Sequence, residues 1–168
     1  FRYDVRPIID SAIARYGYDE WKANVMTDEF HGHLGVYSIV GAKMGIRARE
    51  IFGVGPDMLN VSTYAGTKPP YSCLNDGIQV STGATPGHGL LTVAHDTITK
   101  PVAEFTYMNH RILLTLRPEI SAKIAGELKE IYFVYGLDSN IYWELVRKNS
   151  LKYWKELDRH EIFIIERQ

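Results

Sequence analysis

The stretch Phe30-His31-Gly32-His33-Leu34-Gly35 organises the rest of the chain. Its two histidines are separated by one small residue, and side chains two residues apart project to the same side of an extended segment. Apolar residues then recur at helical spacing, so we expect an extended segment to enter a long helix over residues 35–52 at this point. Imidazole is a common metal ligand, so the pair is a candidate metal half-site; the alternative is a hydrogen-bonded pair that caps the helix.

Composition limits the class of protein. With 168 residues, 45% of them hydrophobic and 23% charged, the chain is an ordinary globular sequence with room for one core. A formal net charge of −1 argues against nucleic acid and anionic membranes as partners. No apolar run approaches the roughly 20 residues of a membrane-spanning helix. We expect a cytoplasmic protein, and a removed signal peptide stays open because the sequence starts at Phe1.

The order of predicted elements indicates an α+β fold. Helical periodicity and helix punctuation predict helices over residues 5–16, 19–26, 35–52, 71–80 and 118–135, and another that Asp138 or Ser139 caps. Alternating patterns predict strands over 58–65, 90–95, 102–108, 111–117 and 162–165, with a hairpin turn at Asn109-His110. We therefore expect an antiparallel sheet covered by helices in one domain over 1–168, with core motifs in 30–117 and a helical tail over 118–168.

Glycines inside the predicted helix 35–52 indicate a close contact. Gly41 and Gly45 each cost about 1 kcal/mol of helix stability relative to alanine, so a compensating contact is expected. Close approach of another backbone supplies one, either within the chain or across a subunit interface. Because the tail is also rich in aromatic and apolar residues, and the strand 162–165 needs a sheet edge in this chain or in a partner, we expect an intertwined homodimer.

A second stretch carries the remaining candidate chemistry. In the predicted helix 71–80, Cys73, Asp76 and Gln79 lie within about two turns. Because Cys73 is the single cysteine, no internal disulfide or four-cysteine zinc ribbon is available, and its thiol is either a small buried hydrophobe or chemically used. The glycine-rich loop over 82–89 lacks the lysine of a nucleotide-binding loop, so we interpret it as a tight turn. We expect His110 to be exposed and without a role.

Together the two stretches resemble the FmdE family, named for a component of formylmethanofuran dehydrogenase. That family tends to have Phe-His-Gly-His-x-Cys-Pro-Gly at a helix start, then Cys-x-x-Asp-(Ala/Gly)-Ile-Gln, then a Thr-Gly-Cys-Thr-x-Gly-Lys-Gly-Asn-Leu loop. The residues of this chain that fit are Phe30, His31, Gly32, His33, Cys73, Asp76, Gly77, Ile78, Gln79, Thr82, Gly83, Thr85, Gly87, Gly89 and Leu91. Two separated motifs in the right order make the resemblance specific, and it implies an α+β core, often dimeric, here without the cysteine-rich zinc finger that some relatives carry.

The departures from the family pattern define the candidate site. Gly35 and Ala84 stand where the family has cysteine, and His88 stands where it has lysine. A dithiol mechanism or a multi-thiolate cluster is therefore not supported. The resemblance implies a metal site of His31, His33 and Cys73, most simply for one zinc ion. Residues expected to support that site or to contact a ligand are Asp76, Gln79, Thr82, Thr85 and His88.

Three classes of function follow from this site. The first is a metal-binding module that senses, stores or delivers an ion, or serves as an accessory component of formylmethanofuran dehydrogenase and so of one-carbon metabolism, with other protein subunits as candidate partners. The second is a metal-assisted enzyme of hydrolytic or formyl-transfer type, with Asp76 as a candidate proton acceptor. The third uses Cys73 as a nucleophile with a histidine base and no metal.

Overall fold

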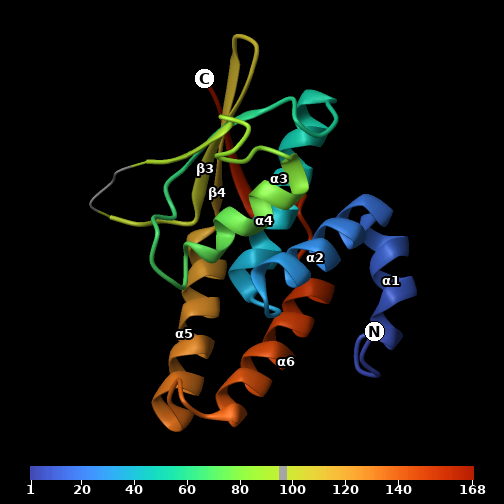
Figure 1. Cartoon of the computed structure of the whole chain (residues 1–168), viewed down its shortest axis with the longest axis vertical. Helices are drawn as coiled ribbons and strands as arrows, with labels where there is room; N and C mark the ends of the chain where they lie inside the picture. Colours follow the sequence, from blue (N-terminus) through green and yellow to red (C-terminus); the bar gives the residue numbers. More distant parts are fainter. Residues whose placement is uncertain (95–97) are drawn as a thin grey trace.

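The computed structural model describes residues 1–94 and 98–168, which contain six helices and five strands. In chain order these are α1 (Arg6–Tyr16), α2 (Tyr18–His31), α3 (Val36–Phe52), β1 (Asn60–Thr63), α4 (Cys73–Thr82), β2 (Leu91–Val93), β3 (Val102–Tyr107), β4 (His110–Leu116), α5 (Pro118–Tyr135), α6 (Asn140–Glu156) and β5 (Phe163–Arg167). Helices α5 and α6 form a hairpin that projects from one end of the molecule, opposite the β3–β4 hairpin (Figure 1). The expected α+β class is confirmed.

The five strands form one mixed sheet in the order β2-β1-β3-β4-β5. The expectation of a purely antiparallel sheet is wrong at one edge, where β1 and β2 are parallel, with Val61 opposite Leu91. The physical reason is the connection between them, because it passes through α4, and a helical crossover returns the chain in its original direction. The final strand, β5, pairs antiparallel with β4 of the same chain, so the sheet edge that it needs is internal.

The hairpin between β3 and β4 turns one residue earlier than the sequence predicted. Tyr107 pairs with His110, which leaves Met108 and Asn109 as the turn and places His110 at the start of β4. Met108 takes a positive φ of 51°, a conformation that sequence patterns rarely assign to methionine. His110 is exposed, as expected. The predicted strand 90–95 is shorter, as β2, and its expected end at His95 lies outside the described residues.

Helix α3 is the centre of the core. Twelve of its seventeen residues are buried, and the main apolar cluster joins it to α4 and to one face of the sheet through residues such as Leu74, Phe105 and Leu114. A second cluster joins α1, α2, α3 and α6, and within it Trp21 stacks on Trp154 with ring centroids 4.7 Å apart. Trp21 is therefore a packing residue.

Charged residues also lie inside this core. Lys43 of α3 is fully buried and its ammonium lies 2.5 Å from a carboxylate oxygen of Glu20 on α2. Arg159 donates to the other oxygen of Glu20 at 2.8 Å and also to Glu50. Buried charges are tolerated only when they are paired in this way. The network fixes α2 against α3 and thereby fixes the short connection between them.

The C-terminal helices begin where their sequence signals predict, and α5 also ends where predicted. Pro118 lies in the first turn of α5 and Gly136 ends it, while the hydroxyl of Ser139 accepts a hydrogen bond from the backbone N–H of Ile141 at the start of α6. Among the helices of residues 1–94 and 98–168, we find none with the length and apolar character needed to cross a bilayer.

Candidate metal centre

The two histidines lie on a tight connection between α2 and α3. His31 is the last residue of α2, Gly32 follows in the left-handed region with φ of 83°, and α3 begins at Val36. The expectation that an extended segment carries both histidines is therefore wrong, because α2 continues to His31 and Gly32 reverses the chain. The turn nevertheless brings the two rings together, with centroids 4.4 Å apart and planes inclined by 39°.

The imidazoles converge on the space left by a glycine. A Cβ atom built on Gly35 would lie 3.5 Å from Nε2 of His31 and 3.5 Å from Nε2 of His33. The side chain of His31 is only 10% exposed and its Nε2 atom is buried. Within the described parts of the chain this nitrogen has no hydrogen-bond partner. A buried ring nitrogen without a partner is costly unless a ligand satisfies it.

Asp76 fixes the orientation of the first ring. Nδ1 of His31 donates to a carboxylate oxygen of Asp76 at 2.6 Å, and Nε2 of Gln79 donates to the other oxygen at 3.4 Å. With the proton held on Nδ1, the lone pair of His31 lies on Nε2. A carboxylate behind a histidine in this way is the arrangement that orients metal-ligating imidazoles.

Close packing of α3 on α4 brings Asp76 to His31. A Cβ on Gly41 would lie 2.1 Å from the carbonyl oxygen of Leu74, and one on Gly77 would lie 2.0 Å from that of Ser38. The helix backbones therefore touch, which only glycine permits at these two positions. The compensating contact expected for the glycines of α3 is thus internal to the chain.

The surroundings of His33 favour its neutral form, which is the form that binds metals. Although His33 is exposed at the molecular surface, partial burial lowers the pKa of its imidazole, and the electrostatic interaction with the neighbouring His31 lowers it further. Its ring meets the edge of Trp143 from α6, with centroids 5.2 Å apart. At neutral pH His33 therefore presents an unprotonated ring whose position is set by an aromatic neighbour.

Cys73 shares a cavity with both histidines. The cavity has a volume of about 320 Å³, and the half-buried thiol lies on its wall. Burial, reinforced by the charge of Asp76, raises the pKa of the Cys73 thiol to about 11. It is therefore protonated at neutral pH in the metal-free chain, which weighs against a metal-free cysteine nucleophile. Among the described residues, no three His, Cys, Asp or Glu side chains are grouped closely enough to hold a metal, so Cys73 lines the site without completing it.

The other predicted site residues stabilise the glycine-rich loop instead of lining this cavity. The buried Thr82 hydroxyl donates to the carbonyl of Ile78 at 2.6 Å, and Thr85 accepts a hydrogen bond from the backbone N–H of His88 at 3.1 Å. The side chain of His88 is 57% exposed, and its Nδ1 lies 3.0 Å from the carbonyl oxygen of Gly83. The loop is thus held by its own hydrogen bonds, in agreement with its interpretation as a tight turn.

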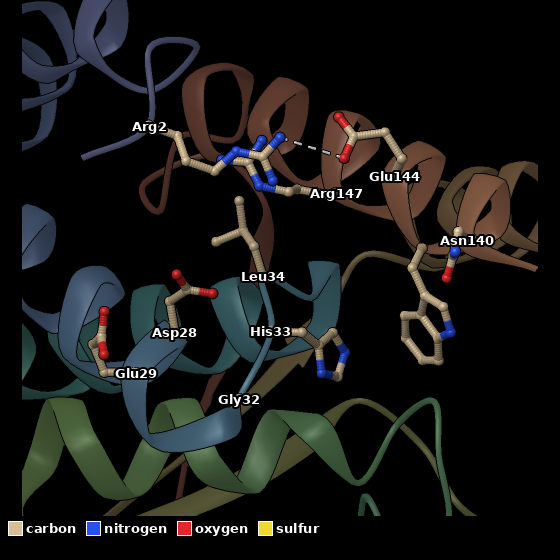
Figure 2. Close-up of a pocket in the computed structure, with 10 residues that line it drawn as sticks. Arg2, Asp28, Glu29, Gly32, His33, Leu34, Asn140, Glu144 and Arg147 are labelled. Carbon is tan, nitrogen blue, oxygen red and sulfur yellow. Dashed lines mark ion pairs between the residues drawn. The ribbon is translucent and has the colours of Figure 1, made fainter.

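A second, charged pocket of about 460 Å³ shares His33 and Trp143 with that cavity. Figure 2 shows the side chains that line it. Asp28 and Glu29 contribute carboxylates to it from the last turns of α2, and burial raises the pKa of Asp28. Arg147 from α6 also faces it but is paired with Asp4. No motif in the sequence marks this outer pocket. Its only sequence signal was that Asp28 lies one helical turn before His31, which required α2 to extend that far.

Comparisons with a family model and with solved structures place this chain among known proteins. A family model described as FmdE, molybdenum formylmethanofuran dehydrogenase operon, matches residues 30–132, which is more than half of the chain. The fold is similar to the crystal structure of a tungsten formylmethanofuran dehydrogenase FmdE-like protein from Syntrophus aciditrophicus, with 17% sequence identity, a TM-score of 0.49, and coverage of 93% of this chain and 74% of that one. No curated protein matches the chain.

Proposed function

Since this chain belongs to the FmdE family, we propose that it is a metal-binding module that holds one divalent ion, preferably zinc, between its two neighbouring histidines. One observation carries the proposal: Nε2 of His31 and Nε2 of His33 both face the vacant position of a Gly35 side chain. The hydrogen bond from His31 to Asp76 supports it, because it leaves the Nε2 lone pair of His31 free for a metal.

The chemistry of the donors favours zinc or a similar borderline metal. Imidazole nitrogen suits zinc, copper and nickel, and a thiolate from the same cavity would strengthen the preference for zinc. We propose Cys73, on the wall of the same cavity, as a third ligand that moves toward the two histidines when the ion binds, because among the described residues it is not grouped closely enough with them to hold a metal. Its thiol would lose its proton on binding, since metal coordination lowers thiol pKa values. A site with three protein ligands keeps a position open for water or another ligand.

The surroundings favour sensing, storage, delivery or an accessory role over catalysis. Among the described residues that line the inner cavity there is no carboxylate or lysine to transfer protons, and Asp76 is already engaged by His31. The family description connects the chain to a formylmethanofuran dehydrogenase operon, so we place this role in one-carbon metabolism. The outer pocket would supply the entry path to His33, since the carboxylates in its lining outnumber its arginines, Arg2 and Arg147.

A second candidate is a metal-assisted enzyme of hydrolytic or formyl-transfer type. It is favoured by Asp28, because this carboxyl lines the pocket next to His33 and burial raises its pKa, the direction expected for a carboxyl that transfers protons. Bound zinc would supply a water molecule whose pKa is lowered to about 7. Turnover of a formyl or acyl substrate that chelators abolish would favour this candidate over the module.

We also propose that the protein is a homodimer that covers the apolar tip of the α5–α6 hairpin. Phe133 and Val134 are 72% and 70% exposed there, and large apolar patches on soluble proteins commonly mark interfaces. Light scattering at micromolar concentration should give the mass of a dimer for the wild type and of a monomer for Phe133→Glu. A monomeric wild type would refute this part of the proposal.

Zinc titration of purified, metal-free protein tests the proposed site. The wild type should bind one zinc ion per chain, and His31→Ala and His33→Ala should each weaken binding by about a hundredfold, because each variant removes a ligand. His110→Ala is the matched control, since it removes an exposed imidazole at the far hairpin and should leave the affinity unchanged. Equal affinity of all four proteins, with retained circular dichroism spectra, would contradict the proposal.

A further inference from the structure

The inner cavity has more space than a metal ion needs. Its 320 Å³ lies between three parts of the chain: the α2–α3 connection, the segment that leads into α4, and the α5–α6 hairpin. Cavities of a few hundred cubic ångströms between packed helices are typical binding places for small molecules. The side chains and glycine that form its wall are His31, His33, Gly35, Val36, Tyr37, Pro69, Pro70, Cys73, Leu128, Leu137, Tyr142, Trp143 and Val146.

The wall of this cavity selects against charge. Apart from the two imidazoles, its described lining contains no acidic or basic side chain, and most of its surface is aliphatic or aromatic. Burial of an uncompensated ion in such surroundings is strongly unfavourable, whereas burial of an apolar group is favourable. The indole N–H of Trp143 donates to the carbonyl of Leu137 at 3.1 Å, so the tryptophan is held in place at the cavity.

A polar anchor lies at one end of this apolar space. The side chain of His31 is nine-tenths buried, lines the cavity, and leaves Nε2 without a hydrogen-bond partner among the described residues. Because Nδ1 of the same ring donates to Asp76, Nε2 is a hydrogen-bond acceptor. In the metal-free chain, Nε2 can accept a hydrogen bond from a donor on a bound molecule. In the metal-loaded chain, the ion can instead bind a lone pair of that molecule.

From these features we infer that the cavity binds a small neutral molecule with an apolar body and one azole, alcohol or thiol head. Such a head offers an N–H, O–H or S–H to Nε2 of His31, or a lone pair to a metal held there. At the packing density of protein interiors, the volume accommodates on the order of ten to fifteen non-hydrogen atoms. The metal-loaded form of this inference rests on the proposed function, whereas the metal-free form does not.

Binding of 4-phenylimidazole and of imidazole, measured by calorimetry on metal-free and zinc-loaded protein, tests the inference. The two probes share the head, and only the first has an apolar body. In both forms of the protein 4-phenylimidazole should bind on the order of thirtyfold more tightly, because its phenyl ring is buried. It should also slow alkylation of Cys73, the single thiol, which lies on the cavity wall.

Two variants locate the binding. Leu128→Trp places a large side chain into the cavity. It should abolish the tighter binding of 4-phenylimidazole relative to imidazole, here called the advantage of 4-phenylimidazole, while zinc affinity is retained. Ala122→Trp adds the same side chain at an exposed position of the same helix and should leave the advantage intact. Persistence of the advantage in Leu128→Trp would overturn the inference, since the probe would then bind elsewhere, such as the apolar hairpin tip.

The outcomes separate this inference from the proposed function. If zinc binds and depends on His31 but the phenyl ring confers no advantage in either form, the cavity inference is overturned and the metal site stands. If the phenyl ring confers its advantage on metal-free protein that cannot be loaded with zinc, the metal site is overturned and the cavity stands.

Discussion

Substitution of Gly35 by cysteine should strengthen zinc binding at the paired histidines, because it adds a thiolate beside both of their Nε2 atoms. Gly35 has extended backbone angles, φ −112° and ψ 144°, so a side chain can be added there without backbone strain. Its Cβ would lie 3.5 Å from Nε2 of both His31 and His33 and 3.3 Å from the hydroxyl oxygen of Ser38, which must shift by a few tenths of an ångström. The added sulfur would then lie beside both nitrogens, at the position where relatives carry cysteine.

The expected gain in zinc affinity follows from the binding free energy that one thiolate ligand contributes. Zinc binds nitrogen at about 2.0–2.1 Å and sulfur at about 2.3 Å, distances that a cysteine at position 35 and the two Nε2 atoms can satisfy together. Four-ligand structural zinc sites contribute about 10–16 kcal/mol, or roughly 3 kcal/mol per ligand. After a cost of about 1 kcal/mol for moving Ser38, the variant should bind zinc about thirtyfold more tightly than the wild type.

Competition titration against a chelator of known zinc affinity would measure this gain. Gly35→Ala is the control, because it adds the same Cβ without a ligand and should bind zinc no better than the wild type. Equal zinc affinities of Gly35→Cys and Gly35→Ala, in variants that remain folded, would refute the convergence of the two Nε2 atoms on this position.

Three further predictions concern the support of the site. Gly77→Ala should lower the free energy of unfolding, measured in urea, by about 2–4 kcal/mol, because its Cβ would lie 2.0 Å from the carbonyl oxygen of Ser38. The control, Gly126→Ala at an exposed position of α5, should raise the free energy of unfolding by about 0.5–1 kcal/mol. Similar changes in the two variants would contradict the close packing of α3 on α4. Asp76→Asn should weaken zinc binding by about 10–100-fold, and an unchanged affinity would show that the hydrogen bond to the histidine does not tune the ligand. Since burial raises the Cys73 pKa to about 11, the alkylation rate of metal-free protein should keep rising with pH up to about 11, and a plateau near pH 8–9 would contradict this burial.

Much of the fold could be predicted from local signals. The apolar periodicity of α3 and α5 and their terminal glycines, Gly53 and Gly136, determine both helices almost to the residue. Helix α2 was predicted too short for a physical reason. Its buried residues include Glu20, Asn24 and Thr27, which a search for apolar periodicity treats as exposed. Only the three-dimensional packing shows that Lys43 and Arg159 neutralise and bury Glu20.

The parallel pair of strands and the tight turn at the histidines needed the structure. A strand pattern does not state its direction, and the long connection through α4 makes β2 parallel to β1. Likewise, the His-x-His spacing predicts neighbouring rings in an extended segment, whereas the left-handed Gly32 achieves the same proximity at a helix end. The conclusion that the rings are neighbours was therefore correct although the conformation assigned to them was wrong.

For the candidate site, sequence motifs identified the polar residues but not the apolar wall of the cavity. The motifs name His31, Cys73 and Asp76; in the structure Asp76 is hydrogen-bonded to His31, and Cys73 lines the same cavity as His31. Leu128 and Trp143 belong to the tail, where no motif marks them, and they reach the cavity only because α5 and α6 fold back over the α2–α3 connection. Residues that contact a site through tertiary packing leave no local pattern in the sequence.

The most direct test of the central claim is anomalous diffraction at the zinc absorption edge from crystals of the zinc-loaded wild type. We predict one anomalous peak per chain about 2.0–2.1 Å from Nε2 of both His31 and His33, with Asp76 still bonded to Nδ1 of His31. A zinc peak elsewhere, or none within bonding distance of these two nitrogens at full loading, would contradict the claim that the paired histidines form the metal site.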